Sequence, residues 1–278
     1  ETRLAATLSA TNSTRFVHFE IEDKSMQARL IEFAEKHEYD REELLSPMFT
    51  CSREAFADYS ADKNRLLMGD FYKWQRRRLG ILVDDEGQPK GGRWSFDADN
   101  RKRLPKDTMP PAIDWPAPNE HVDDVIEIVA HEFADHPGKA SDFRWPTTRE
   151  QVLTWLDQFI ETRLAEFGPY EDAIIGENSL LHHSVLTPML NVGLITPQEI
   201  IDRSLDYAKK HQVLLNSTEG FVRQIMGWRE FIRGIYMSRG TDQRTTNFWG
   251  FSKKIPSSFY TGTTGIDPID ITIKKVLE

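Results

Sequence analysis

The sequence is poor in cysteine and has no long apolar run. Its single cysteine, Cys51, excludes an internal disulfide and an all-cysteine metal site within these 278 residues. No apolar stretch approaches the roughly 20 residues that a membrane-spanning helix needs, and the chain has no secretory apolar region. One cysteine in a chain of this length fits a reducing compartment, so we expect a cytoplasmic protein without a membrane segment.

Common nucleotide and metal motifs are also missing. No G-x-G-x-x-G and no Walker loop occurs, so a nucleotide would have to be held by another arrangement. The pattern "HEFADH" (131–136) resembles a zinc-protease motif, but its histidines are separated by about 140° around a helix and do not share a face. The net charge of −9 argues against non-specific coating of nucleic acid, although a local basic groove is compatible with it.

The pattern that is present begins with an α/β part, residues 1–62. Within it, 15–22 alternates like a strand, 25–37 is an amphipathic helix and 44–50 suits a further strand. One such unit cannot cover its own sheet, so we interpret it as the end of an α/β, Rossmann-like domain. The chain starts at Glu1 without a methionine and stops inside an apparent helix, which predicts a slice of a longer protein.

A helix and a long connection follow, over residues 63–119. Residues 63–79 read as a helix with a basic end. From about 84 to 119 the chain is polar, rich in proline and glycine and without a periodic pattern. A connection of this length suggests a functional or wrapping linker.

The last part, residues 120–278, is helical. Two of its helices begin with predicted capping boxes, Thr147 with Glu150 and Thr196 with Glu199. The sequence therefore predicts a mainly α chain preceded by the end of an α/β domain.

The helical stretch 219–237, "EGFVRQIMGWREFIRGIYM", has a wide apolar arc. At 100° per residue, aromatic and aliphatic side chains cover about half of its circumference, too much for one buried face. Gln224 falls inside that arc and Arg229 near its edge. A buried amide and a buried guanidinium need polar partners, so this stretch is a candidate binding site. For Trp228, which lies on the same face, core packing is the simpler alternative.

A second stretch, "NSLLHHSVLTPMLNVGLITP" (178–197), is a candidate anion site. Thr187 and Pro188 are typical of the N-cap and first residue of a helix. The hydroxyls of Ser184 and Thr187, together with the free N–H groups of that helix start, could bind an anion, and His183 could add a donor. The simpler alternative is that Thr187 only caps the helix.

Together these stretches resemble a known family. "HSVLTP" (183–188), followed about forty residues later by "EGFVRQIMGWREF", resembles the flavin-binding helical domain of the photolyase/cryptochrome family. "GGRWSFDADNRKRLP" (91–105) and the stretch 219–237 narrow the resemblance to its bacterial iron–sulfur branch, the photolyase-related proteins. The resemblance covers most of the chain from about residue 63 onward and is weaker before it. It implies that 120–278 is an incomplete FAD-binding domain and that 1–62 is the end of an antenna domain.

The resemblance also implies a binding site for a U-shaped FAD. Ser184, Leu186 and Thr187 would hold its phosphates, and Arg229 would meet the same pyrophosphate. Tyr170 stands where the family places a tyrosine against the FAD. The residues implied to contact the cofactor are Tyr170, His183, Ser184, Leu186, Thr187, Asn191, Gln224 and Arg229.

The chemistry that the resemblance implies is light-driven DNA repair. The family uses reduced flavin, excited by blue light, as an electron donor to a UV-damaged pyrimidine pair. Trp228 matches the aromatic that stacks on the flipped-out lesion and Gln224 matches a polar group of that pocket, so both are candidate catalytic residues. Flipping a damaged base costs less than flipping an intact one. The implied partner is UV-damaged DNA, bound by a monomer.

Two positions depart from the family pattern. The first cysteine ligand of the [4Fe–4S] cluster should follow the "FYTG" stretch, but Pro268 occupies that position. Proline cannot replace a thiolate, so we expect no cluster or a changed one. Tyr260 stands at an electron-relay position where relatives carry tryptophan. A lumazine-type antenna chromophore is compatible with a longer form of the protein.

Three functional hypotheses remain open from the sequence. The first is repair of pyrimidine photoproducts, of the (6–4) type that this branch tends to repair. The second is a cryptochrome-type blue-light receptor without repair activity, and the third is a family member that has lost its chemistry. The first two need the same flavin residues, so the sequence does not separate them.

Overall fold

The computed structural model describes residues 2–176 and 178–277 of the chain. Helices dominate the described residues, and the strands form one two-stranded sheet. The prediction of a mainly α chain preceded by a small α/β part is confirmed. No helix among the described residues is long and apolar enough to cross a membrane.

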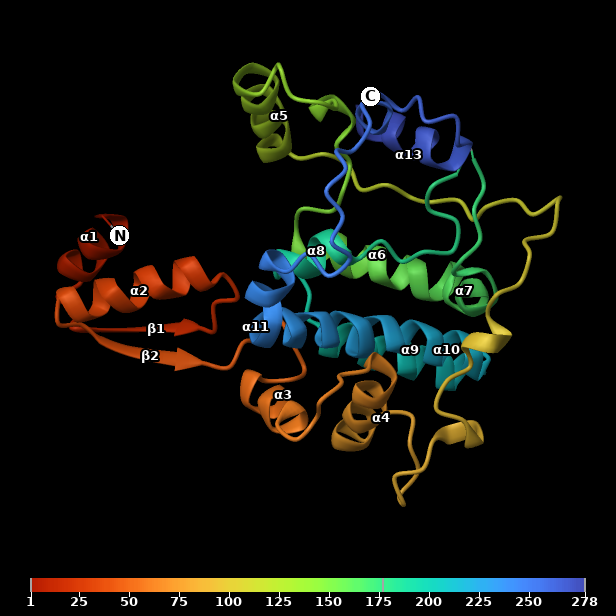
Figure 1. The fold of residues 1–278 in the computed structure, drawn as a ribbon, viewed down its shortest axis with the longest axis horizontal. Coiled ribbons are helices and arrows are strands. Elements are labelled where there is room, and N and C mark those ends of the chain that lie inside the picture. Colours follow the sequence, from red (N-terminus) through yellow and green to blue (C-terminus); the bar gives the residue numbers. More distant parts are fainter. Residues whose placement is uncertain (1, 177, 278) are drawn as a thin grey trace.

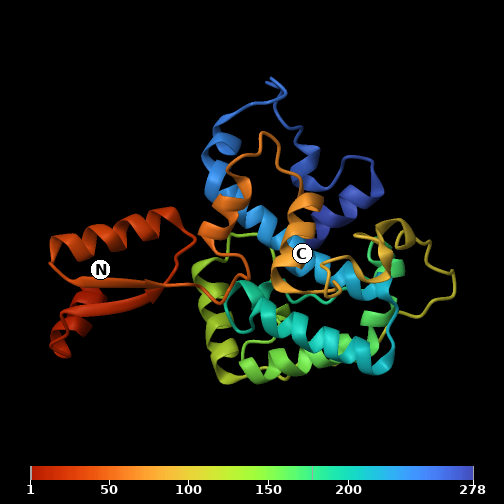
Figure 2. The ribbon, with the colours of Figure 1, turned by 90° about the horizontal axis from the view of Figure 1, so that it is seen from below.

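The α/β part lies to one side of the helical body (Figures 1 and 2). Its elements are α1 (Thr2–Ala10), β1 (Arg15–Phe19), α2 (Lys24–Lys36) and β2 (Asp40–Leu44). The two strands are parallel, with Arg15 opposite Asp40. On α2, Phe33 is buried and stacks on Tyr39, with their ring centres 5.7 Å apart. This contact covers one face of the sheet.

The predicted strand 44–50 is wrong, because the chain pairs at Asp40–Leu44 instead. The observed strand "DREEL" is polar, so no apolar alternation marks it in the sequence. Its acidic residues are exposed or half-buried and have ion-pair partners, such as Arg15 for Glu42 and Arg41 for Glu43. Pro47 lacks the N–H that further pairing would need.

The helical body contains the remaining elements. These are α3 (Arg53–Ser60), α4 (Met68–Leu79), α5 (Glu120–Glu132), α6 (Arg149–Thr162), α7 (Leu164–Tyr170), α8 (Thr187–Asn191), α9 (Pro197–His211), α10 (Leu215–Val222), a π-helix (Arg223–Arg229), α11 (Glu230–Thr245), α12 (Ser258–Thr261), α13 (Asp267–Leu277) and three 3₁₀ turns (Lys90–Gly92, Asp97–Asp99, Ala140–Asp142). In Figure 1, α6 and α7 lie above α9 to α11, with α3 and α4 below.

The core sits between α6, α7 and α10. The rings of Phe159 and Phe221 have centres 4.7 Å apart, and Phe167 meets Phe221 edge-on at 5.4 Å. α7 and α10 approach so closely that a Cβ on Gly168 would lie 2.7 Å from the backbone of Ser217. The Ser217 hydroxyl fills this contact, accepting from the Gly168 N–H at 3.1 Å and donating to the Ala165 carbonyl at 2.6 Å. Glycine is required at 168 for this reason.

Helix starts were predicted with mixed success. The Thr196–Glu199 capping box is confirmed. The other box is displaced by one residue, since Thr148 caps α6 with Gln151 rather than Thr147 with Glu150. Gln151 accepts from the N–H of both threonines, so the sequence offers two overlapping registers. The helix predicted over 63–79 starts later, at Met68.

The stretch 219–237 is not one uniform α-helix. It comprises the end of α10, the π-helix and the first half of α11. A π-turn takes in an extra residue, so the faces before and after it are rotated relative to a constant 100° period. Trp228, Ile232 and Tyr236 are 45%, 56% and 44% exposed. The wide apolar arc is therefore only partly buried, with Phe221, Ile225 and Phe231 in the core and Trp228, Ile232 and Tyr236 exposed.

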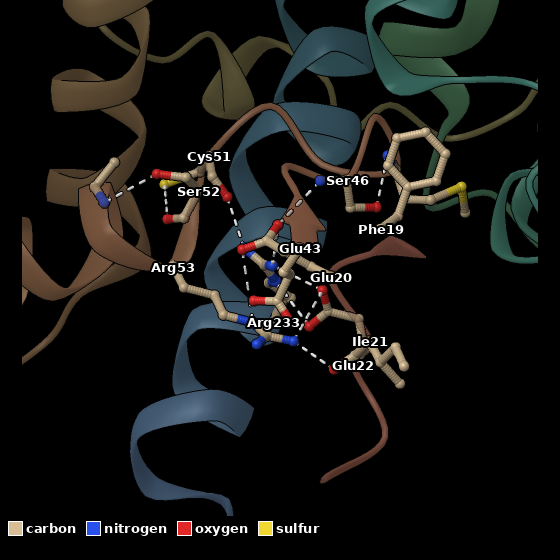
Figure 3. Close-up of polar contacts among 12 residues, drawn as sticks. Phe19, Glu20, Ile21, Glu22, Glu43, Ser46, Cys51, Ser52, Arg53 and Arg233 are labelled. Carbon is tan, nitrogen blue, oxygen red and sulfur yellow. Dashed lines mark hydrogen bonds and ion pairs between the residues drawn. The ribbon is translucent and has the colours of Figure 1, made fainter. Parts of the chain in front are cut away.

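A cluster of buried and partly buried charged side chains attaches the α/β part to α11 (Figure 3). We call Glu20, Glu22, Arg53, Glu230 and Arg233 the clamp. Arg233 donates to Glu22 Oε1 at 2.7 Å, to Glu22 Oε2 at 3.0 Å and to Glu20 Oε2 at 3.5 Å. Arg53 Nε lies 3.8 Å from Glu20 Oε1. These charges join segments about 200 residues apart, as the 211-residue separation of Glu22 and Arg233 shows.

Backbone groups complete the clamp. The buried Glu230 carboxylate accepts from the N–H groups of Thr50 and Cys51 at 2.9 and 3.1 Å. Arg233 also donates to the Cys51 carbonyl at 2.7 Å. Burial raises the pKa of Glu230, an effect that these hydrogen bonds oppose. Glu230 and Arg233 of the clamp therefore hold the backbone of Thr50 and Cys51, the segment just before α3.

Candidate functional site

A cavity of about 850 Å³ lies between the α7–α8 connection and the π-helix. This volume is in the usual range for small-molecule and cofactor sites, about 300 to 1,000 Å³. The structure brings together around it all but one of the predicted cofactor residues, together with Trp228. Those that line it are His183, Ser184, Leu186, Thr187, Asn191, Gln224, Trp228 and Arg229. The two candidate stretches, predicted separately, thus form opposite parts of one cavity.

One wall of the cavity, residues 181–187, has an unusual backbone. Leu181 and Val185 have φ values of 42° and 51°, and a β-branched residue such as valine rarely adopts a left-handed conformation. The wall ends in the short helix α8, whose N-cap is Leu186 rather than Thr187. The predicted N-cap role of Thr187 is therefore wrong, because Thr187 is already the first helical residue.

The polar side chains of this wall have unused hydrogen-bonding capacity. Within the described residues, the hydroxyls of Ser184 and Thr187 make no hydrogen bond, nor does the amide of Asn191 at the end of α8. His183 meets the Phe167 ring at right angles, with centres 6.4 Å apart. These donors border the cavity and are available to a ligand.

Tyr170 is not brought into the cavity. It is absent from the cavity lining, and the centre of its ring lies 5.6 Å from that of His182. His182 is only 5% exposed, and both of its ring nitrogens lack a hydrogen-bond partner among the described residues. Burial lowers the pKa of His182, Glu166 opposes this, and Arg163 and His183 add to it. The neutral imidazole therefore suits this position.

The other predicted residues on the π-helix each have a partner or an exposed face. Gln224 Nε2 donates to Glu171 Oε2 at 3.4 Å. Arg229 lines the cavity, but its Nη1 donates to the Met48 carbonyl at 2.5 Å and its guanidinium lies 4.1 Å from the centre of the Phe49 ring. Trp228 is 45% exposed and makes no hydrogen bond among the described residues. Among the described residues, Trp228 is thus not part of the buried core.

A polar end of the cavity was missed by the sequence reasoning. Arg223 is 7% exposed and donates to Ser95 Oγ at 2.8 Å and to Asp97 Oδ1 at 3.0 Å. It also lies 3.6 Å from Glu171 Oε1 and 3.8 Å from Glu219 Oε1. Burial raises the pKa of Glu171, and Arg223 opposes this effect. Asp97, Glu171 and Arg223 line the cavity.

A signal for this polar end is present in the sequence. Ser95 and Asp97 belong to the motif 91–105 that supports the family resemblance, and Arg223 precedes Gln224 directly. A linker with a specific polar motif indicates a partner elsewhere in the chain. That partner is the π-helix.

The positions that depart from the family pattern lie away from the cavity. Tyr260 is 68% exposed on α12 and does not line the cavity. Pro268 is the second residue of α13. Nothing in these two helices contributes to the cavity lining.

A comparison with protein families settles the relationship. The family of deoxyribodipyrimidine photo-lyase-related proteins matches residues 1–145, more than half of the chain. The chain belongs to this photolyase-related family. The match includes residues 1–62, where the motif resemblance was weakest, so the family relationship extends to the α/β part.

Individual relatives agree with this assignment. A "(6-4) photolyase" of Agrobacterium fabrum is 34% identical over 230 residues, which are 83% of this photolyase-related chain and 45% of the relative. "Uncharacterized protein R853" of Acanthamoeba polyphaga mimivirus is 41% identical over 110 residues, 39% of this chain and 84% of that protein.

A solved structure shows the same fold. The bacterial class III photolyase from Agrobacterium tumefaciens superposes with a TM-score of 0.56 at 17% identity, over 97% of this chain and 52% of that one. The photolyase-related chain thus spans about half the length of the (6-4) photolyase and of this solved structure.

Proposed function

We propose that this photolyase-related chain binds FAD in the cavity and, within a longer protein, serves blue-light-driven repair of UV pyrimidine photoproducts of the (6–4) type. One observation carries the proposal. The residues implied to bind FAD come from two stretches about forty residues apart, and all except Tyr170 border a single cavity of about 850 Å³. The relative named (6-4) photolyase supports the choice of lesion.

The cavity residues fit a flavin dinucleotide. A pyrophosphate needs donors, and the free hydroxyls of Ser184 and Thr187 supply them on one wall. The isoalloxazine and adenine rings need apolar surfaces, which Phe167, Phe221 and Ile225 provide in the lining. Residues 120–278 with the linker would then be the FAD-binding part, and 1–62 the end of an antenna domain.

When bound, reduced FAD supplies an excited electron donor for opening the damaged pyrimidine pair. The chain's own residues bind and orient. Trp228 offers an exposed ring at the cavity, on which a flipped base would stack. Gln224 offers an amide beside it, and Leu186 with Phe221 excludes water from the interior.

The proposal is tested on the full-length protein. Its flavin spectrum is recorded, and DNA carrying either cyclobutane dimers or (6–4) adducts is then illuminated with blue light in its presence. We expect bound flavin and light-dependent loss of the (6–4) adduct. Bound flavin without reversal of either lesion would favour the receptor alternative, and absence of flavin would refute the cavity assignment.

We also expect that protein purified without oxygen contains no stoichiometric iron, because Pro268 occupies the position of the first cluster ligand. Iron analysis and visible absorption check this. About four irons per chain would contradict our alignment of the region after Tyr260.

A further inference from the structure

Two buried side chains hold the cavity wall from behind. Trp155 Nε1 donates to the Ser184 carbonyl at 2.8 Å, and Arg163 Nη1 donates to the His183 carbonyl at 3.0 Å. Trp155 is 2% exposed and Arg163 is fully buried. Neither lines the cavity. Consecutive carbonyls of the wall are thus fixed by one donor in the middle of α6 and one at the α6–α7 junction.

The wall needs such fixing because its backbone is strained. Leu181 and Val185 adopt left-handed conformations that cost free energy for residues other than glycine. Such conformations persist only where surrounding contacts over-determine them. The carbonyls held by Arg163 and Trp155 belong to His183 and Ser184, which lie between the two strained positions.

Arg163 carries a cost that core packing does not explain. Its Nε and Nη2 atoms are buried without a hydrogen-bond partner, and no carboxylate pairs with it among the described residues. Burial accordingly lowers its pKa to about 10. Arg76 is equally buried, yet it donates to three carbonyls, those of Ile81, Leu82 and Trp94. An apolar side chain would fill the space of Arg163 more cheaply.

We infer that Arg163 and Trp155 are positioning residues for the proposed cofactor site. They hold the strained wall in the form that presents the Ser184 and Thr187 hydroxyls to the cavity. This inference rests on the proposed function for the identity of the ligand. The holding of the wall itself is a property of the protein without ligand.

The test compares Arg163→Met with Arg76→Met in the full-length protein. Both changes remove a fully buried guanidinium, but Arg76 does not contact the wall. Amide hydrogen exchange is measured without flavin, and FAD affinity is measured by equilibrium dialysis. We expect Arg163→Met to raise exchange over 179–187 and to weaken FAD binding by about tenfold or more. Arg76→Met should lower stability, but it should leave the FAD affinity at the parental value and should not raise exchange over 179–187 specifically.

A conservative pair of variants completes the test. Arg163→Lys keeps a donor and should recover part of the protection, whereas Trp155→Phe keeps an aromatic ring and should loosen Ser184. If Arg163→Met does not fold, the Trp155→Phe result decides. Unchanged exchange over 179–187 in both Arg163→Met and Trp155→Phe, or an equal rise in Arg76→Met, would overturn the inference. A loosened wall with parental FAD affinity would overturn it as well.

Failure of the proposed function and failure of the positioning role give different results. If the parent protein binds no FAD, the proposed function fails, while the exchange experiment still shows whether Arg163 and Trp155 hold the wall. If the parent binds FAD and the variants behave like Arg76→Met, the proposed function stands and the positioning role is refuted.

Discussion

Arg223 and Arg233 are ten residues apart on one continuous helical segment and are almost equally buried, at 7% and 6% exposure. Within the clamp, Arg233 donates hydrogen bonds to Glu22, to Glu20 and to the Cys51 carbonyl. Arg223 borders the cavity, and its Nε has no hydrogen-bond partner among the described residues. Arg233 thus makes a full set of hydrogen bonds with the protein, whereas Arg223 is ion-paired but has one donor, Nε, without a hydrogen bond.

This difference distinguishes a buried arginine that has a structural role from one that belongs to the candidate site. A buried charge whose donors are all used connects segments and stabilises their arrangement. A buried charge beside a cavity that has one donor without a hydrogen bond is less completely satisfied, and it should contribute less to stability. Variants that remove each arginine should therefore fail in different ways.

The largest expected effect is on stability, from Arg233→Met. This change leaves Glu20 and Glu22 without their main cation and should cost roughly 3–5 kcal/mol. Arg223→Met should cost less, because Glu171, whose pKa is already raised by burial, can be protonated beside the cavity. Urea unfolding of both full-length variants measures the difference. Equal losses would break the comparison between clamp and cavity.

Trp228→Ala should change binding but not stability. The ring is 45% exposed, so its removal leaves no closed cavity in the core. We expect a melting temperature near that of the parent, retained FAD, and roughly 1–3 kcal/mol weaker binding to UV-damaged DNA. Trp249→Ala is the matched control, because Trp249 is 73% exposed and does not line the cavity. A Trp228→Ala protein that distinguishes damaged from intact DNA as well as the parent removes this residue from the site.

Arg229 stands between the two regions and should show a mixed effect. It lines the cavity, yet it donates to the Met48 carbonyl and lies over the Phe49 ring. These two residues directly precede the segment that the clamp binds. Arg229→Ala should weaken FAD retention by roughly 1.5 kcal/mol and lower the stability of the protein by a similar amount. Flavin occupancy and thermal unfolding are measured together. Parental flavin occupancy would assign Arg229 to the clamp side alone.

The smallest effect concerns pH. Burial holds the pKa of His182 below the ordinary 6.5, so the unfolded chain binds a proton more readily than the folded one. Stability contributed by neutral His182 is present above pH 6.5 and is lost as the pH falls through 6.5 towards the lowered value. His182→Phe, which keeps a ring against Tyr170, should make unfolding less dependent on pH in this window. An unchanged pH profile would show that His182 is not the group responsible.

The sequence predicted which residues line the cavity better than it predicted the backbone geometry that brings them there. His183, Ser184, Gln224 and Trp228 were found because two short motifs resemble a family, and contact with one cavity follows from that fold. The π-helix was missed because a constant period of 100° hides one extra residue in a turn.

Other misses have equally local causes. The strand Asp40–Leu44 has no apolar alternation, so only its pairing with β1 reveals it. Apart from Glu219 on the same helix, partners of Arg223 lie about 50 and 130 positions away, as the separations from Glu171 and Ser95 show. A contact across that distance leaves no periodic trace in one sequence. The capping box at 148–151 was off by one residue, because Thr147 and Thr148 are both suitable caps.

The central claim is that the cavity holds the FAD phosphates against the Ser184–Thr187 wall. Its most direct test is FAD affinity, by equilibrium dialysis, of full-length protein carrying Ser184→Ala with Thr187→Ala. The control pair is Thr154→Ala with Thr162→Ala, two exposed hydroxyls that bond within α6. We predict that the wall pair weakens FAD binding by roughly 1.5–3 kcal/mol for each charged hydrogen bond lost, while the control pair keeps the parental affinity. Equal FAD affinity in the parent and the wall pair would contradict this placement of the cofactor.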